Sequence, residues 1–243
     1  MNARVTKDDI QAAAARIEGH VHATPIMQML VPGRAAPLPV KLENTQLTGS
    51  FKVRGAFNTL LASDVPDGGV VAASGGNHGA AVAFAARALG HPAAIFVPEI
   101  AGPSKISLIR ETGADLTVTP GAYSDALAAA RDHEAKTGAM QIHAYDAPMT
   151  VAGQGTLLRE WDAQGLEADT VLIAVGGGGL MGGVGSAIKA LKPDTRVVAV
   201  EPTGCASLYG SLQAGEPVSV QSDTICDGVA VPYMTHEMFP VLR

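Results

Sequence analysis

A lysine and two glycine-rich loops are the parts of this 243-residue chain best suited to chemistry. Lys52 follows Gly49 and Ser50 and precedes an apolar segment. Ser50 or Thr48 is therefore expected to cap a helix with Lys52 in its first turn. A cation there opposes the helix dipole, and residues that break local rules tend to mark function. A lysine amine can act as a nucleophile or a general base, although an isolated lysine is more often a solvated surface residue.

The first loop has the sequence SGGNHG at residues 74–79, between an apolar run and an alanine-rich segment. Small residues before a helix leave backbone N–H groups free to bind an anion. Ser74, Asn77 and His78 add side-chain donors, so a carboxylate is the natural ligand. The alternative is an ordinary glycine-rich turn capped by Asn77, with His78 as a core residue.

The second loop consists of four consecutive glycines, Gly176–Gly179. Without Cβ atoms the backbone can wrap closely around a ligand, and a phosphate monoester is the simplest one at a helix N-terminus. A nicotinamide dinucleotide is the competing ligand, because the pattern G-x-G-x-x-G is matched by Gly177, Gly179 and Gly182. Glu201 ends the next apolar run at roughly the dinucleotide spacing. Such a match arises easily within a glycine run, and it leaves Lys52 without a role.

The scaffold for these residues is predicted by apolar runs that alternate with helical segments from residue 70 onward. Strands are predicted at Val70–Ala73, Ala93–Val97, Leu116–Thr119, Gln141–Ala144, Val171–Val175 and Val197–Val200. Helices are predicted at Ala80–Leu89, Ser104–Thr112, Ser124–Lys136, Val151–Gln164 and Leu180–Leu191. Left-handed helix ends are predicted at Gly90, Gly113, Gly138 and Gly165. Such alternation predicts a parallel sheet, and continuously apolar runs predict strands buried on both faces. Ligands bind at the carboxyl ends of such strands, where both loops lie.

Composition indicates a compact globular protein and excludes several classes of partner. The chain is 47% hydrophobic and 16% charged, with a net charge of -6, so it offers no basic surface for nucleic acid or for an anionic membrane. No apolar run approaches the length of a membrane span, and Thr6–Asp9 resembles a capping box before an alanine-rich helix. Cys205 and Cys226 have neither metal-ligand nor redox-pair spacing, which predicts a cytoplasmic protein.

A lysine, a carboxylate loop and a phosphate loop together suit a cofactor with an aldehyde at one end and a phosphate at the other. The chain resembles the fold type II pyridoxal phosphate enzymes, whose fold is tryptophan synthase β-like, and among them the threonine and serine dehydratases and their relative serine racemase. The matching motifs run in order along nearly the whole chain: Ser50–Ala56, Ser74–Gly79, Ala152–Thr156, Gly176–Gly179 and Val198–Pro202.

This resemblance implies a role for each matching residue. Lys52 would carry pyridoxal phosphate as a Schiff base and act as general base, and Ser74 would be a second catalytic residue. Phe51 would pack beside the cofactor ring and Asn77 would face its hydroxyl. The phosphate would be held by Gly176, Gly177, Gly178, Gly179 and Met181. The substrate carboxylate would be bound by Ser74, Gly75, Asn77 and His78.

The implied activity is that of a threonine/serine ammonia-lyase, which removes the β-hydroxyl of L-threonine or L-serine and yields a 2-oxo acid and ammonia. Racemase relatives carry a second serine where this chain has Gly75, so elimination is expected to exceed racemisation. Some relatives bind a divalent cation through positions that match Glu201, Cys205 and Ser207. The carboxylate lost at Ser207 weakens such a site, and no metal is expected. The resemblance also implies a homo-oligomer, either a dimer or a tetramer.

The expected architecture is α/β, with two lobes of parallel sheet and flanking helices. Residues 1–64 and 148–243 are predicted to form a discontinuous cofactor-binding domain, and residues 65–147 a small domain. The family continues beyond the segment that matches Cys226–Val231, whereas this chain stops at Arg243, so the fold is expected to be C-terminally incomplete. A chain that binds the cofactor without turnover, or that only scaffolds a partner, is the non-enzymatic alternative.

Overall fold

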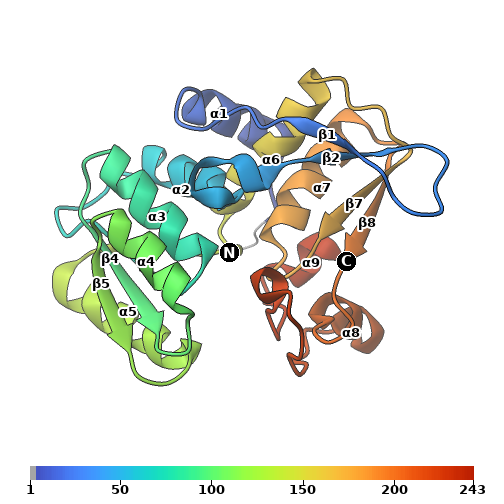
Figure 1. The fold of residues 1–243 in the computed structure, drawn as a ribbon. Helices are drawn as coiled ribbons and strands as arrows, with labels where there is room; N and C mark the ends of the chain where they lie inside the picture. The colour runs from blue at the N-terminus through green and yellow to red at the C-terminus, as the bar shows by residue number, and fades with distance from the viewer. Residues whose placement is uncertain (1–3) are drawn as a thin grey trace.

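The computed structural model describes residues 4–243 and has the predicted α/β architecture (Figure 1). Its α-helices are α1 Lys7–Ile17, α2 Lys52–Leu61, α3 Asn77–Ala88, α4 Pro103–Glu111, α5 Tyr123–Thr137, α6 Pro148–Ala163, α7 Gly179–Leu191, α8 Ser207–Ala214 and α9 Phe239–Leu242. Its strands are β1 Ile26–Met29, β2 Leu38–Lys41, β3 Val70–Ala73, β4 Ala93–Pro98, β5 Asp115–Thr119, β6 Met140–Gln141, β7 Thr170–Ala174 and β8 Arg196–Val200. Short 3-10 helices cover Glu43–Thr45, Leu47–Gly49 and Asp227–Val229.

The predicted alternation of strands and helices is confirmed, with small shifts at the ends. Strand β3 has the predicted bounds, and the predicted glycines at the helix ends all have positive φ: Gly90, Gly113, Gly138 and Gly165. Strand β6 is shorter than predicted and covers Met140–Gln141. The carbonyl of Ala144, which was assigned to that strand, instead accepts a hydrogen bond from Lys52. The capping box at Thr6 and Asp9 is also confirmed.

One sheet is complete and covered on both faces. Its strand order is β5-β4-β3-β6, and every pair is parallel. Residues Val70 and Ala72 of β3 share a core with α3 and α4, whereas Val71 and Ala73 pack with α5. The four residues of β3 are buried, as the continuously apolar run predicted. The loop at residues 74–79 leaves this sheet at the carboxyl end of β3.

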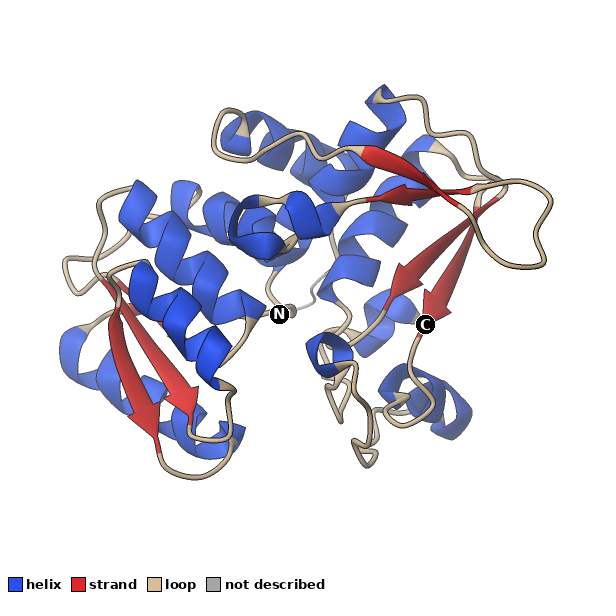
Figure 2. Ribbon diagram, viewed as in Figure 1, coloured by secondary structure: helices blue, strands red, loops and turns tan. Residues whose placement is uncertain are grey.

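The second strand region is divided into two small sheets. Strands β7 and β8 pair in parallel, while β1 and β2 form an antiparallel hairpin above them (Figure 2). A groove of about 790 Å³ lies between these sheets, and its lining includes Val40, Trp161 and Leu172. The prediction that β7 is buried on both faces is wrong, since Leu172 is 57% exposed. Within residues 4–243 no layer covers this face of β7.

The hairpin β1–β2 was not predicted from the sequence, and its antiparallel pairing means that the fold is not wholly parallel. Pro39 lies inside β2, opposite Gln28. Proline lacks the N–H that a central strand needs and normally marks a strand edge or a loop. Because of Pro39, a search for apolar runs does not predict this short strand.

Glycines allow the central helices to approach closely. A Cβ on Gly153 of α6 would lie 2.6 Å from the Cα of Gly55 in α2, and a Cβ on Gly155 would lie 2.9 Å from the carbonyl oxygen of Gly183 in α7. Helix α6 therefore packs between α2 and α7, and it joins the two strand regions. None of the helices within residues 4–243 is long and apolar enough to cross a membrane.

The strand regions lie at opposite ends of the molecule (Figure 1), with the four-stranded sheet beside α3, α4 and α5 at one end, and β7, β8, α8 and α9 at the other. Helix α2 packs against both α3 and α6. Residues 65–147 contain the whole four-stranded sheet. The division into domains at residues 64/65 and 147/148 stays a prediction.

Candidate active site

Lys52 is the first residue of α2, as predicted, but the predicted cap is wrong. The N-cap residue is Phe51, which has helical φ and ψ, and no side chain caps the helix. Thr48 has a φ of 63°, in the left-handed region, so the chain turns before the helix begins. The hydroxyl oxygens of Ser50 and Thr48 are buried and have no hydrogen-bond partner within residues 4–243. Strain and unpaired polar groups of this kind concentrate at functional sites.

The amine of Lys52 is held in a partly buried, ring-lined position. Its Nζ donates a hydrogen bond to the carbonyl oxygen of Ala144 at 2.7 Å. The Nζ lies 5.3 Å from the ring centroid of Phe51 and 5.8 Å from that of Tyr145. Burial lowers the pKa of Lys52 to about 8, against an opposing effect from the charge of Asp146. The neutral amine, which is the nucleophilic and basic form, is thus accessible near neutral pH.

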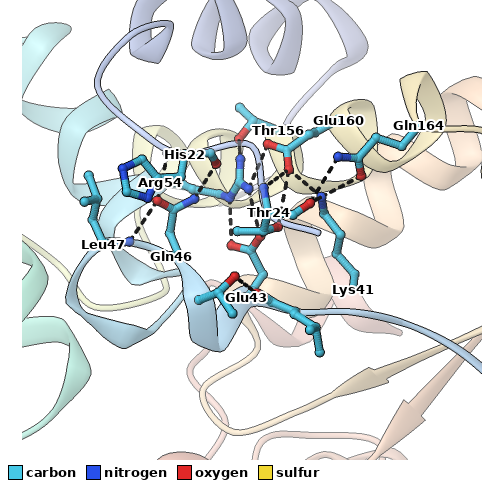
Figure 3. Close-up of polar contacts among 12 residues, drawn as sticks. His22, Thr24, Lys41, Glu43, Gln46, Leu47, Arg54, Thr156, Glu160 and Gln164 are labelled. Atoms are coloured by element: carbon cyan, nitrogen blue, oxygen red, sulfur yellow. Dashed lines mark hydrogen bonds and ion pairs between the residues drawn. The ribbon is translucent and has the colours of Figure 1, made fainter. Parts of the chain in front are cut away.

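A buried ionic cluster fixes the first turn of α2 (Figure 3). Arg54 is 1% exposed, and its Nε and Nη2 donate to the two carboxylate oxygens of Glu43, both at 2.8 Å. Its Nη2 also lies 2.9 Å from Oε2 of Glu160, which pairs with Lys41. Two cations and two anions offset one another, so no charge in the cluster is buried alone. Arg54 lies in the first turn of α2, and its partners Glu43 and Glu160 come from other segments of the chain.

The cluster extends into neighbouring elements through hydrogen bonds drawn in Figure 3. Thr24 contacts both Glu43 and Glu160, and Gln164 accepts from Lys41 at 2.7 Å. These bonds connect the hairpin β1–β2, a 3-10 segment, α2 and α6. Because all four elements share one polar network, the position of Lys52 depends on each of them.

The loop at residues 74–79 joins β3 to α3, whose N-cap is Gly76. The Oγ of Ser74 accepts the N–H of Gly76 at 3.2 Å, and Asn77 is exposed as the first residue of α3. The first N–H groups of a helix have no partner within it, so this loop presents backbone donors. The anion site predicted from the sequence has the expected local geometry, and a carboxylate ligand stays a prediction.

His78 is buried in the same loop and is uncharged near neutral pH. Burial and the neighbouring charge of Lys52 lower the pKa of His78 to about 3. Its Nε2 lies 2.9 Å from the carbonyl oxygen of Ile142, so this nitrogen carries the proton and donates it. The ring therefore offers no positive charge to a carboxylate, and its assigned part in substrate binding stays a prediction.

Gly75 lies where a side chain would collide with the next loop. A Cβ there would come within 2.5 Å of the Cβ of Ala101 and 3.0 Å of Cγ1 of Val97. The surroundings of residue 75 therefore suit a glycine, because a serine side chain there would force Ala101 to move.

The four glycines form the loop predicted to hold a phosphate, called the phosphate cradle below, and this role stays a prediction. Gly178 is the N-cap of α7 with a φ of 90°, and a Cβ there would lie 2.7 Å from Leu242. Side chains on Gly177 or Gly179 would overlap Tyr145. The backbone can take this path only without Cβ atoms, and it places free N–H groups at the positive end of a 13-residue helix. Met181 is half-buried in the first turns of α7 and packs on the adjacent core.

Tyr145 and Asp146 bring the predicted parts together, and neither was singled out from the sequence. The ring of Tyr145 faces Lys52 on one side and the glycine loop on the other. Asp146 interacts electrostatically with both Lys52 and His78. Lys52 and both loops therefore meet at one place. The available signal was positional: Tyr145 and Asp146 directly follow the strand predicted at Gln141–Ala144.

Among the weak candidates for a metal site, Glu201 has other partners. The Glu201 carboxylate accepts the N–H groups of Leu208 at 2.8 Å and Tyr209 at 2.9 Å, so it caps α8. Cys205 and Ser207 are buried. Among residues 4–243 no group of three or more histidine, cysteine, aspartate or glutamate side chains has metal-site geometry. Because the Glu201 carboxylate caps α8, it is also not free to bind the ribose of a dinucleotide.

Comparison with known proteins identifies the family to which this site belongs. Residues 17–243 match the family described as pyridoxal-phosphate dependent enzyme. An L-threonine ammonia-lyase of Geobacter sulfurreducens is 36% identical over 239 residues, which is 96% of this chain and 60% of that protein. A phenylserine dehydratase of Ralstonia pickettii is 36% identical, over 98% of this chain and 75% of that protein. The structure of maize serine racemase superposes with a TM-score of 0.92 at 35% identity, covering 99% of this chain and 74% of that one.

These similarities favour pyridoxal phosphate over the nicotinamide dinucleotide, and they agree with the amine, the phosphate cradle and the anion loop. The chain spans about 60% of the length of the ammonia-lyase that it matches. Over the part that it spans, this chain belongs to the pyridoxal-phosphate dependent enzymes.

Proposed function

We propose that this chain uses pyridoxal phosphate to eliminate the β-hydroxyl of a 3-hydroxy amino acid, with L-threonine and L-serine as the reference substrates, and so forms a 2-oxo acid and ammonia. The observation that carries the proposal is Lys52, a half-buried amine with a pKa lowered to about 8 that lies between an anion loop and a phosphate cradle. Two relatives are named for the loss of ammonia or water from threonine and phenylserine, which are both 3-hydroxy amino acids.

The chain's own residues suit the cofactor in three places. The amine of Lys52 would bond its aldehyde, and the N–H groups of Gly176–Gly179 would bind its phosphate. The ring of Phe51 lies beside Lys52 and would pack against the pyridine. When bound, pyridoxal phosphate supplies an electron sink that makes the Cα proton of an amino acid acidic.

The protein then has to bind the substrate and move a proton. The free N–H groups at the start of α3, with Ser74, Gly75 and Asn77, would hold the substrate carboxylate. The neutral amine of Lys52 would accept the Cα proton as general base, and the carbonyl oxygen of Ala144 orients its Nζ. Burial of Lys52 supports the neutral form of the amine, whose Nζ lies beside the rings of Phe51 and Tyr145.

Elimination is proposed over racemisation because of Gly75. A racemase needs a proton donor on the face opposite the lysine, and a glycine cannot supply one. The 2.5 Å approach to Ala101 shows that a serine at this position has no room without rearrangement.

The test combines cofactor trapping with product analysis. Borohydride reduction of the loaded chain, followed by peptide mapping, should place the label on Lys52. Incubation with L-threonine and L-serine should release ammonia and the matching 2-oxo acids, and Lys52→Ala should reduce turnover by about 10²- to 10⁴-fold. Lys189→Ala, an exposed lysine of α7, is the matched control. Label on another lysine would refute the site, while label on Lys52 without ammonia would favour the non-catalytic alternative.

Three further proposals concern the whole protein. We propose a cytoplasmic location, which is consistent with two free cysteines, one buried and one exposed. A homo-oligomer, either a dimer or a tetramer, should be visible by light scattering. Limited proteolysis should release fragments that end near residues 64 and 147 if the domain division is correct.

A further inference from the structure

A cavity of about 150 Å³ lies beside Lys52, on the side of the four-stranded sheet. It is enclosed by residues from α5, from the segment after β6 and from the C-terminal loop. Its lining combines three tyrosines with the polar side chains of His78, Arg131, Gln141, His143 and Asp146.

The cavity adjoins the reactive amine. Ala144, whose carbonyl oxygen holds the Nζ of Lys52 at 2.7 Å, is part of its lining. Tyr145, whose ring centroid is 5.8 Å from that Nζ, forms another part. His78 lines the cavity from the loop assigned to the substrate carboxylate. A group attached to the β-carbon of a substrate held between that loop and Lys52 therefore has this cavity within reach.

Tyrosine rings form one part of the lining, and polar side chains such as Gln141 and His143 form another. Three of the chain's four tyrosines face the cavity, and the hydroxyl of Tyr145 donates to that of Tyr233 at 3.2 Å. Burial raises the pKa of Tyr145 and of Tyr123, so both remain neutral phenols. Arg131 and Asp146 carry opposite charges across the same lining. The three phenol rings suit an uncharged ring, which pairs with them in edge-to-face or offset geometry.

The volume also points to a ring. An apolar cavity of about 150 Å³ in another protein has room for benzene, so a cavity of this size can hold a ring, whereas the methyl group of threonine would leave most of it unfilled. Unfilled space gains no contacts for the substrate.

We infer that this cavity is the subsite for the β-substituent and that the chain prefers 3-hydroxy amino acids with an uncharged aromatic ring on the β-carbon over L-threonine. The predicted preference in turnover rests on the proposed elimination, whereas the predicted binding of an aromatic ring in the cavity does not. The reaction needs no further reactant: the β-carbon–oxygen bond breaks, the hydroxyl leaves as water, and one water returns in the hydrolysis that releases ammonia. L-threo-3-phenylserine would thus give a 2-oxo-3-phenylpropanoic acid.

Two measurements on the chain loaded with pyridoxal phosphate test the inference. The value of kcat/KM for L-threo-3-phenylserine should exceed that for L-threonine by at least about tenfold, the low end of the discrimination that a side-chain pocket provides. L-phenylalanine, which has no β-hydroxyl to lose, should bind at least about tenfold more tightly than L-alanine by titration calorimetry.

Variants of Tyr233 test whether the preference for an aromatic ligand comes from the cavity. Tyr233→Ala should abolish the advantage of the aromatic ligand in both measurements, whereas Tyr233→Phe keeps the ring and should preserve it. Tyr209→Ala is the matched control, because Tyr209 is 63% exposed on α8 and lies outside the cavity lining.

The outcomes separate this inference from the proposed function. Turnover of L-threonine without an aromatic preference in either measurement would overturn the inference and leave the elimination intact. Absence of ammonia from every substrate, together with tighter binding of L-phenylalanine that Tyr233→Ala removes, would support the cavity assignment and refute the elimination. Absence of both would overturn both.

Discussion

The strands β3 and β7 have similar sequences and opposite surroundings. Each is a short apolar run followed by a glycine-rich loop and a helix. Strand β3 lies inside a four-stranded sheet with helices on both faces, and Val71 is 0% exposed. Strand β7 has β8 as its only partner within residues 4–243, and Leu172 is 57% exposed beside the groove of about 790 Å³.

The difference shows what an apolar run does and does not specify. It specifies that a strand forms, because β-branched and aliphatic residues favour that conformation. It does not specify which neighbours cover the strand. Each strand is followed by a loop with the expected local geometry. The geometry of such a loop therefore depends less on how many layers cover the strand than the burial of the strand does.

The strongest test of this contrast places one charge in each strand. Val71→Asp should cost at least about 4 kcal/mol, because a carboxylate would be buried without a partner, and the chain should fail to fold. Leu172→Asp should change stability by less than about 1 kcal/mol and should reduce self-association through the open face of β7. Urea denaturation followed by circular dichroism, with light scattering, measures both effects. Equal destabilisation by the two substitutions would mean that another molecule covers β7 in solution.

The fold was predictable where sequence signals are local. The alternation from residue 70 to residue 200 identified the strands and helices, since each has its own apolar run or glycine end. Hairpin β1–β2 escaped because Pro39 interrupts the pattern of β2. The exposure of Leu172 escaped because burial depends on layers that a single strand does not encode.

The two glycine loops can be compared in the same way. Gly178→Asp should weaken pyridoxal phosphate binding by about 10- to 100-fold. The aspartate would take a strained left-handed φ, crowd Leu242 and repel the phosphate. Gly76→Ala in the other loop should leave cofactor affinity unchanged, because a Cβ there meets no atom within 4 Å. Cofactor titration by absorbance provides both dissociation constants, and wild-type affinity in Gly178→Asp would contradict the phosphate assignment.

Gly75 tests how tightly the covered sheet constrains its loop. Gly75→Ser should destabilise the chain by about 1–3 kcal/mol, because its Cβ would lie 2.5 Å from that of Ala101. Gly75→Ser combined with Ala101→Gly should recover most of that loss. Chiral analysis of L-serine incubated with the double variant then shows whether the added hydroxyl raises racemisation above the parent. A stable single variant would mean that this loop moves more freely than the packing indicates.

The site was only half predictable, and the reason is sequence distance. Lys52 and both loops carry local signatures. The cluster around Arg54 depends on Glu43 and Glu160, which are 11 and 106 residues away, so no local pattern reveals it. Tyr145 and Tyr233 are 88 residues apart and meet only through the fold.

Lys52 lies where the two regions meet, so its pKa reports on both. Burial lowers that pKa to about 8, and Asp146 opposes the shift because its negative charge stabilises the protonated amine. The labelling rate of Lys52 in the cofactor-free chain should therefore rise through about pH 8, well below the ordinary lysine value of 10.5. Asp146→Asn removes the stabilising charge, so the midpoint should fall further, by up to about one pH unit.

The matched control is Asp162→Asn, whose carboxylate pairs with Lys192 at 2.9 Å and not with the site. It should leave the labelling midpoint of Lys52 unchanged in competitive labelling read by mass spectrometry. The free energy of unfolding also depends on this pKa. Between about pH 8 and 10.5 the unfolded chain binds the Lys52 proton more tightly than the folded chain does. The contribution of Lys52 to stability therefore rises with pH across that range. A midpoint near 10.5 in the parent chain would show that water reaches the amine freely and that the two regions do not close around it.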